Sequence, residues 1–360
     1  MTITDLDRYY TPTSVANRVL EHAVLDRIPL VCADTTCGSG RLLEAASNVF
    51  GRVSCIGIDR DKDAIRKLRR QNPEWLLAIG NILCKKRQRG IYATILKMNV
   101  DLLIMNPPFS QGHKKSIDIS YQGKVLKGSV AMAHLLMSCE LFRPSQGALA
   151  IVPESLLYSD TDLAGRSALR ENFCIQPILE LDSYTFKGAR AHASVIQISR
   201  GPAEGEDESH LINKTKTGRN VEVKVTRGGL PVHMMKLARD GVPYLHSTEI
   251  RKVVAGVSPH NFLHTRNQVK GRVEGWMILL PRVGLPELDI ARAVNFKSPI
   301  QLSDCVLAIG CKSKVDALEV EQRLRNNWTD LVLLYRGTGA RYVTLSRLIA
   351  WLAGNNICEI

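Results

Sequence analysis

Residues 30–40 read Leu-Val-Cys-Ala-Asp-Thr-Thr-Cys-Gly-Ser-Gly, and this stretch decides the fold. The apolar run at 30–34 predicts a buried β-strand, and the pattern over 41–49 predicts a helix directly after it. Glycines at 38 and 40 allow the connecting turn to adopt positive φ and let a ligand approach the backbone closely. A strand, a glycine turn and a helix in this order begin an α/β unit with a parallel sheet.

The rest of the first half repeats this alternation. Helices are expected at 62–70 and 130–142, and further strands at 53–59, 101–105, 147–153 and 194–198. This pattern predicts a doubly wound, Rossmann-like α/β domain over residues 1–200.

A second domain is expected beyond a linker. Residues 201–218 are polar, begin with Gly-Pro and include a run of acidic residues, which is typical of a linker. Residues 219–360 then predict a smaller α+β domain, with a strand near 305–309 and helices at 315–324 and after 342.

Composition narrows the function classes. The 360 residues carry a net charge of +13, spread over both halves of the chain, which favours a polyanionic partner touching both. The nine cysteines lack metal-ligand spacing, so neither zinc nor disulfides are expected. With no apolar run of membrane-span length and no signal-peptide pattern at the N-terminus, we expect a cytoplasmic protein without a membrane partner.

Two acidic residues suggest a cofactor. Asp59 ends the second expected strand, where a carboxylate can accept hydrogen bonds from both hydroxyls of a ribose. Asp34 would repel a pyrophosphate but could pair with an ammonium group, and the loop lacks the Lys-Ser/Thr ending of a P-loop. S-adenosylmethionine carries an ammonium and a ribose but no phosphate, so it suits this loop. Alternatively, Asp34 caps the helix and Asp59 is a solvated strand end.

The segment Asn106-Pro107-Pro108-Phe109 follows the strand at 101–105. Pro107 restricts Asn106 to an extended conformation, and the prolines stiffen the turn. The Asn106 side-chain oxygen and the Pro107 carbonyl can each accept one hydrogen of an exocyclic amine, so that its lone pair can face a methyl donor. Phe109 can stack on a base taken out of its duplex.

At these residues the chain resembles the DNA adenine-N6 methyltransferases of the gamma class, of restriction-modification or orphan type. The resemblance covers residues 1 to about 200 and rests on motifs in the family's order. These are Tyr10–Ala16, Asp34–Gly40, Asp59–Arg60, Gly80–Leu83, Asn106–Phe109, and Thr185–Lys187 with Ala193–Ile196.

The resemblance implies a site-specific enzyme that transfers a methyl group from S-adenosylmethionine to N6 of a flipped adenine in duplex DNA. The implied catalytic residues are Asn106, Pro107, Pro108, Phe109 and Phe186. The implied cofactor-binding residues are Tyr10, Thr11, Pro12, Asp34, Thr36, Cys37, Gly38, Gly40, Asp59, Arg60, Asn81, Ile82 and Asn106.

The chain departs from the family at three places. Thr35-Thr36 replaces a proline and a small residue, Asn81 stands where aspartate is usual, and Phe109 replaces the commoner tyrosine. Asn81 keeps an acceptor oxygen for the cofactor's adenine but loses the charge. Asn106 favours adenine, because cytosine-N4 enzymes tend to carry serine there.

Basic residues are candidates for DNA contact. Residues 110–128 read as a basic loop at the mouth of the site, with Lys114, Lys115, Lys124 and Lys127. In the second domain, which corresponds in position to a target-recognition domain, Arg336 and Arg341 flank a glycine turn. The alternatives are an ordinary solvated loop and a turn leading into a helix.

Other functions remain open at this point. Asn-Pro-Pro-aromatic motifs also serve methyltransferases that act on RNA adenine, guanine amino groups or a protein glutamine. The chain could also be a modification subunit that depends on a specificity subunit, and a cognate restriction enzyme is a further expected partner.

Overall fold

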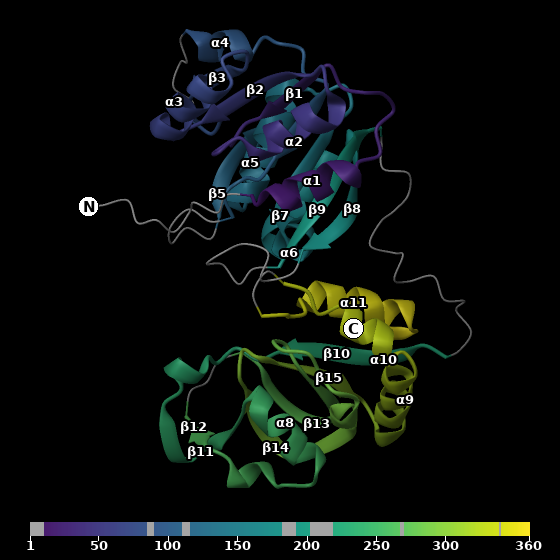
Figure 1. Cartoon of the computed structure of the whole chain (residues 1–360). Coiled ribbons are helices and arrows are strands. Elements are labelled where there is room, and N and C mark those ends of the chain that lie inside the picture. Colours follow the sequence, from purple (N-terminus) through teal and green to yellow (C-terminus); the bar gives the residue numbers. More distant parts are fainter. Residues whose placement is uncertain are drawn as a thin grey trace. The chain divides into compact units, whose positions relative to one another are not determined.

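The computed structural model describes residues 11–84, 90–109, 116–181, 192–201, 219–266, 270–337 and 340–360. The chain divides into two compact units (Figure 1). The first unit comprises residues 1–205 with 337–339, and the second comprises residues 206–336 with 340–360. Of the expected linker, all but residue 201 lies outside the described residues.

A seven-stranded sheet forms the centre of the first unit, in the order β3-β2-β1-β4-β7-β9-β8. Only β9 runs against the others, because it pairs antiparallel with both β7 and β8. The strands are β1 (Val31–Asp34), β2 (Ser54–Asp59), β3 (Leu76–Ile79), β4 (Leu102–Met105), β7 (Ala148–Pro153), β8 (Phe173–Leu181) and β9 (Ala193–Arg200). The expected doubly wound α/β fold is therefore confirmed.

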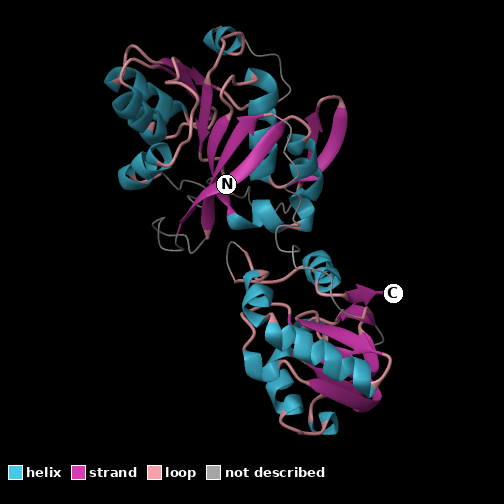
Figure 2. Ribbon diagram, turned by 90° about the vertical axis from the view of Figure 1, so that its right-hand side faces the viewer, coloured by secondary structure: helices cyan, strands magenta, loops and turns pink. Residues whose placement is uncertain are grey.

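Helices cover both faces of this sheet (Figure 2). One face packs on α1 (Thr13–Glu21), α2 (Arg41–Phe50) and α3 (Lys62–Gln71), and the other on α4 (Ile91–Ile95), α5 (Val130–Phe142) and α7 (Leu163–Arg170). The short α6 (Glu154–Tyr158) follows β7. A sheet covered on both faces needs strands that are apolar throughout, as β4 and β7 are.

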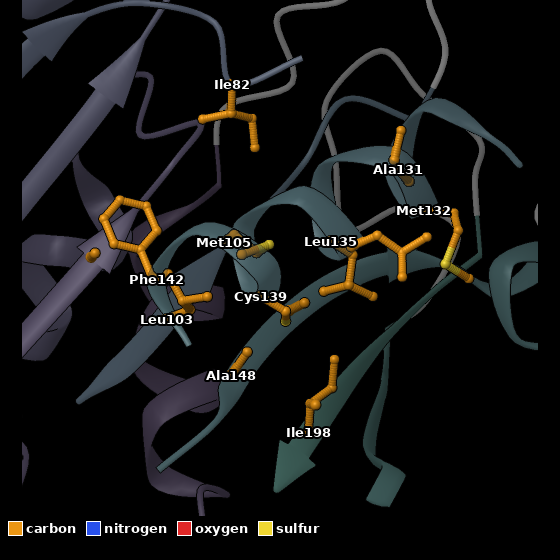
Figure 3. Packing of buried hydrophobic residues seen from close by; sticks show 14 of the residues in the cluster. Ile82, Leu103, Met105, Ala131, Met132, Leu135, Cys139, Phe142, Ala148 and Ile198 are labelled. Carbon is orange, nitrogen blue, oxygen red and sulfur yellow. The ribbon is translucent and has the colours of Figure 1, made fainter. Parts of the chain in front are cut away.

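The core alternates along each strand, as the pleat requires. In β4, Leu102 and Ile104 face the core under α2, whereas Leu103 and Met105 face the core under α5. Helix α5 is buried on nearly all sides, and Ser129 caps it by accepting a hydrogen bond from the Met132 N–H. Figure 3 shows its apolar residues lying against the strands.

The expectation of a basic loop at 110–128 is wrong in its second half. Residues 117–128 form a hairpin of β5 (Ile117–Tyr121) and β6 (Lys124–Gly128), inserted between the Asn106–Phe109 segment and α5. Ile119 and Tyr121 face inward and are buried, whereas the outward residues are polar, which is a strand pattern with period 2. Lys124 and Lys127 therefore lie on strand β6.

The second unit contains another seven-stranded sheet, in the order β12-β11-β14-β13-β15-β10-β16. Its strands are β10 (Val221–Arg227), β11 (Leu237–Leu245), β12 (His264–Thr265), β13 (Arg272–Pro281), β14 (Ala293–Leu302), β15 (Val306–Cys311) and β16 (Ile357–Glu359). One face packs on α9 (Lys314–Asn326), α10 (Trp328–Leu333) and α11 (Leu345–Gly354), and the other on α8 (Ile250–Val254). A second unit that contains both helices and strands is thus present, where the sequence predicted a smaller α+β domain. Within the described ranges no helix has the length and apolarity that a membrane crossing requires.

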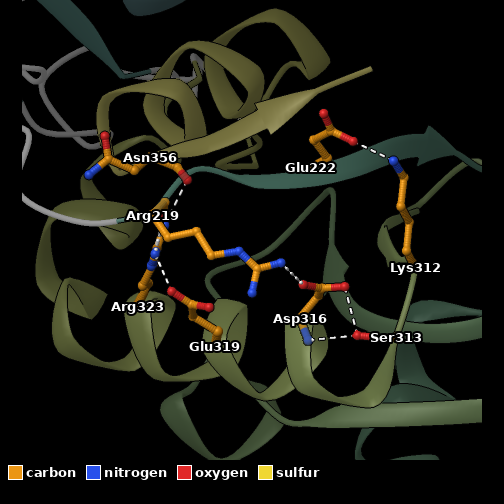
Figure 4. A network of polar contacts seen from close by, with 8 residues as sticks. All are labelled: Arg219, Glu222, Lys312, Ser313, Asp316, Glu319, Arg323 and Asn356. Atoms are coloured by element: carbon orange, nitrogen blue, oxygen red, sulfur yellow. Dashed lines mark hydrogen bonds and ion pairs between the residues drawn. The ribbon is translucent and has the colours of Figure 1, made fainter.

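A polar network joins α9 to the backbone just before β10 and β16, which are neighbouring strands at one edge of the second unit's sheet (Figure 4). The Arg323 guanidinium donates to the carbonyls of Asn356 at 2.6 Å and Arg219 at 2.6 Å, and also pairs with Glu319. Arg323 thus satisfies the backbone before β10 and before β16 with one side chain. Lys312 and Glu222, by contrast, pair at the exposed surface.

We expect Arg323→Met to destabilise the second unit by about 2–4 kcal/mol, because it leaves the backbone carbonyls before β10 and before β16 without a charged donor. The matched control is Lys312→Met, which removes only an exposed ion pair and should cost at most about 1 kcal/mol. Urea unfolding of the whole chain, followed by tryptophan fluorescence, measures both, since three of the four tryptophans, Trp276, Trp328 and Trp351, lie in this unit. Equal losses in the two variants would contradict the assigned role.

Candidate functional site

The candidate site lies at the carboxyl ends of the parallel strands of the first unit, where ligands bind in doubly wound sheets. The loop after β1 is held there by neighbouring backbone: the Cys37 N–H donates to the Ile58 carbonyl at 3.0 Å. Gly38 and Gly40 have φ of +49° and +79°. A Cβ on Gly40 would lie 2.7 Å from the Leu68 side chain, so a larger residue would have to displace that side chain and would also be strained at this positive φ.

Asp59 links this loop to the start of α3. Its carboxylate accepts the Gly38 N–H at 2.7 Å and the Asp61 N–H at 2.8 Å. Each carboxylate oxygen has a second lone pair, so these two bonds leave acceptor capacity for two ribose hydroxyls. Asp59 therefore shapes the loop besides having the chemistry to bind a ribose, and its neighbour Arg60 is exposed.

Asp34 is almost fully buried at the end of β1. Burial, together with the nearby carboxylate of Asp59, raises the pKa of Asp34 to about 8, although hydrogen bonds from Thr36 act in the opposite direction. Its Oδ1 accepts the Thr36 N–H at 2.9 Å. At neutral pH the ligand-free carboxyl therefore holds a proton, and a neighbouring ammonium would favour the loss of that proton. Asp34 does not cap α2: the residue at the N-cap is Gly40.

We expect cofactor binding to release protons from Asp34 between roughly pH 5 and 8. An ammonium beside the carboxyl lowers its pKa, so the complex holds fewer protons than the free protein in that window. Titration calorimetry at pH 7 in buffers of different ionisation enthalpy measures the number of protons. Asp34→Asn should abolish the release. Identical binding enthalpies in all buffers for the natural protein would rule out this pairing.

The turn after β3 contains Asn81 and Ile82. Asn81 Oδ1 accepts the Leu83 N–H at 2.9 Å, which fixes the turn and leaves one lone pair of that oxygen for a ligand. Ile82 is buried in the core on the α5 side, where Figure 3 shows it. Just before them, Gly80 lies so close to Tyr92 that a Cβ would lie 2.0 Å from the ring.

The predicted catalytic segment, Asn106–Phe109, follows β4, which pairs with β1, so Asn106 and Asp34 lie at the ends of adjacent strands. Asn106 Nδ2 donates to Thr11 Oγ1 at 3.1 Å. Because the amide nitrogen of Asn106 faces Thr11, its oxygen Oδ1 points away from Thr11. Oδ1 therefore stays available to accept a hydrogen bond from an amine. Pro107 is buried, and Phe109 is partly buried against the core on the α1 and α2 side.

The N-terminal motif has a role that the sequence did not indicate. Thr11 was expected to contact the cofactor, but its described hydrogen bond is with Asn106. Pro12 is the N-cap of α1 and its carbonyl accepts the Val15 and Ala16 N–H groups. Among the other predicted site residues, Tyr10, Phe186, Lys114 and Lys115 lie outside the described residues.

Thr35, a departure from the family pattern, joins the glycine loop to α5. The Ser138 hydroxyl donates to the His134 carbonyl at 2.6 Å, so Thr35, 2.8 Å from Ser138, must be the donor in the contact between the two hydroxyls. These partners are 103 positions apart in the chain, and no local pattern in the sequence predicts their contact.

Two of the lysines expected at the mouth of the site lie on the hairpin. Its tip, at Gln122, contacts Glu140 near the end of α5, so the tip is directed toward the amino ends of the parallel strands. Lys124 is beside the tip and pairs with Glu171. Lys127 is closer to the carboxyl ends, opposite Asp118 in the hairpin register. Of this pair, only Lys127 is placed toward the site.

The two arginines of the second unit that were expected to contact DNA, Arg336 and Arg341, form hydrogen bonds within that unit. Arg336 pairs with Tyr342 through backbone hydrogen bonds, and its Nε donates to the Leu333 carbonyl. The Arg341 carbonyl accepts the Gly284 N–H. Their contact with nucleic acid stays a prediction. No group of three or more His, Cys, Asp or Glu arranged to hold a metal ion occurs in the part of the chain that the structure describes.

Part of the first unit is similar to known methyltransferases. Residues 15–139 match the family model of the methyltransferase small domain. The rRNA N(6)-adenosine-methyltransferase METTL5 of Danio rerio is 30% identical over 132 residues, which are 36% of this chain and 60% of that protein. The chain thus spans about three fifths of the length of this relative.

Solved structures also show likenesses. A Listeria monocytogenes protein assigned to the class I S-adenosylmethionine-dependent methyltransferases has 18% identity and a TM-score of 0.40, over 57% of this chain and 64% of that chain. TrmN of Thermus thermophilus has 12% identity and a TM-score of 0.33, over 52% and 49%.

The class of the first unit follows from its own strand order, its site and the matched family model. It contains a methyltransferase domain of the Rossmann-like type, and the cofactor of this class is S-adenosylmethionine. The donors present fit that molecule: a buried carboxyl for the ammonium, a carboxylate for the ribose and an amide beyond β3.

Proposed function

We propose that the chain methylates the N6 amino group of adenine in a nucleic acid. The observation that carries the proposal is the amide of Asn106, which ends the strand beside the glycine loop and is oriented by Thr11. An exocyclic amine needs two acceptors and no activated nucleophile, and Asn106 Oδ1 with the Pro107 carbonyl supplies both.

In this proposal, some residues bind the cofactor and others position the amine. Bound S-adenosylmethionine supplies an electrophilic methyl group. Asp34 holds the ammonium of that molecule and Asp59 its ribose, and Asn106 turns the lone pair of the amine toward the methyl group. Because both hydrogens of the amine are accepted by the protein, the nitrogen approaches tetrahedral geometry before transfer. Phe109 offers an apolar face for the base.

For the polymer we favour RNA over the duplex DNA that the motifs predicted. The curated relative is by name an rRNA adenosine methyltransferase, and its match falls on 132 residues of this chain. A net charge of +13 suits either polymer. Duplex DNA is the second candidate, favoured by the motif order of residues 10–109 and by the separate second unit, which would then recognise the target and require base flipping.

The deciding experiment is methyl transfer from labelled S-adenosylmethionine by the purified whole chain to RNA, duplex DNA, single-stranded DNA and protein. Digestion to nucleosides separates N6-methyladenosine from N6-methyldeoxyadenosine. We expect label in N6-methyladenosine, and far less of it with Asn106→Ala. Label in deoxyadenosine would instead establish the DNA enzyme. Label in protein alone, or in none of the four acceptors, would refute the proposed function. Activity only after adding a specificity subunit would make the chain one part of an assembly.

A further inference from the structure

His134 lies in α5 at the level of the cofactor loop. Its carbonyl accepts the Ser138 hydroxyl one turn further on, and Ser138 meets Thr35 directly after β1. A helical side chain leans toward the N-terminus of its helix, and α5 runs away from the carboxyl ends of the strands. The imidazole of His134 therefore lies about one turn beyond the Thr35 contact, past the end of β1. The charge of Arg60, next to Asp59, acts on it.

The ring of His134 is buried without a partner. The residue is 7% exposed, its Nδ1 is enclosed, and among the described residues neither ring nitrogen has a hydrogen-bond partner. Nε2 is not among the enclosed atoms, so Nε2 is the ring nitrogen that reaches accessible space. Burial, reinforced by Arg60, lowers the pKa of His134 to about 4, so the ring is neutral.

A neutral imidazole has one N–H and one lone pair. An enclosed N–H without an acceptor is rarer in proteins than an unpaired acceptor, so we assign the proton to Nε2 and the lone pair to Nδ1. His134 then presents one hydrogen-bond donor to the site. A leucine would fill the same space without the cost of burying an unpaired polar atom.

We propose that His134 is a cofactor-binding residue, whose Nε2–H donates to an acceptor atom in the adenosine half of the methyl donor. The adenine ring nitrogens and the ribose oxygens are acceptors of the required kind. The inference rests on the proposed function for the identity of that cofactor. We favour the adenosine half over the methionine half because the charge of Arg60 acts on His134. Arg60 directly follows Asp59, the proposed ribose acceptor, so His134 lies on the ribose side of the site.

The test compares two ligands: S-adenosylmethionine and 5′-methylthioadenosine, which lacks the amino acid. For His134→Leu in the full chain we expect an affinity about tenfold lower for both, as the loss of about 1.4 kcal/mol predicts, with thermal stability unchanged or higher. His134→Gln, which keeps an N–H donor, should recover to within about threefold. Asp34→Asn is the control, because it should weaken only the ligand with the ammonium.

A second measurement uses the natural protein, so it does not depend on whether a variant folds. In the natural protein labelled with 15N-histidine, addition of 5′-methylthioadenosine should shift the Nε2 resonance of one buried, neutral histidine. An unchanged spectrum in the presence of bound ligand, or an unchanged affinity in a folded His134→Leu variant, would overturn the assignment. Cofactor binding that depends on His134 without methylation of any nucleic acid would instead refute only the proposed function.

Discussion

Asn106→Ala should slow methyl transfer by about 10²–10³-fold, the cost of removing one oriented partner of the reacting group. The amine then loses an acceptor, and its lone pair stays conjugated with the base. S-adenosylmethionine affinity should change little, because Asp34 binds the ammonium and Asp59 the ribose of the cofactor without Asn106. Single-turnover rates at saturating cofactor measure the effect directly.

Thr11→Val provides the matched control for orientation. Valine has nearly the shape of threonine but cannot accept the Asn106 Nδ2 hydrogen bond of 3.1 Å. The amide is then free to turn, so we expect a smaller loss of turnover number, about tenfold, at unchanged cofactor affinity. Undiminished turnover in Asn106→Ala would remove the central residue of the proposal, and a loss of cofactor affinity in Thr11→Val would place Thr11 in the cofactor site instead.

The second large effect concerns cofactor binding. Asp59→Ala should weaken S-adenosylmethionine binding by roughly 10–100-fold, because hydrogen bonds to a charged group contribute about 1.5–3 kcal/mol. The substitution removes the ribose acceptor and also the acceptor of the Gly38 and Asp61 N–H groups. Calorimetric titration of the folded variant gives the dissociation constant.

Asp61→Ala separates helix capping from ligand binding. Asp61 caps α3 by accepting the Asp63 and Ala64 N–H groups, so its loss should cost about 1 kcal/mol of stability. We expect its cofactor affinity to stay within about threefold of the natural protein. Equal losses of affinity in Asp59→Ala and Asp61→Ala would show that loop order, and not ribose binding, explains the effect.

The sequence predicted the elements whose pattern is strong. The helix at 130–142 has the predicted limits, since Ser129 caps it and Phe142 precedes a turn residue of positive φ. The strands at 54–59 and 102–105 are within a residue of the expected ranges, because runs of buried β-branched and aliphatic residues carry their own signal. The order of the site segments along the sheet also follows from local motifs.

Other features depend on tertiary contacts. Strand β3 is four residues long and too short to show a period, and the strands of the second unit are held together by pairing between distant segments. The contacts Thr11–Asn106 and Thr35–Ser138 join residues 95 and 103 positions apart. The orphaned nitrogen of His134 is visible only once burial is known, because a histidine in an apolar helix is ordinarily a satisfied core residue.

The hydrogen bond from Asn106 to Thr11 also bears on how the chain could be divided into fragments. Thr11 lies directly before α1, which packs against α2 and contributes no strand to the sheet. A fragment lacking α1 would lose the partner that orients the catalytic amide, and also the four buried residues with which α1 covers the sheet. Methylation would then depend on complementation by a separate α1 peptide, which makes this junction a natural place for a split reporter.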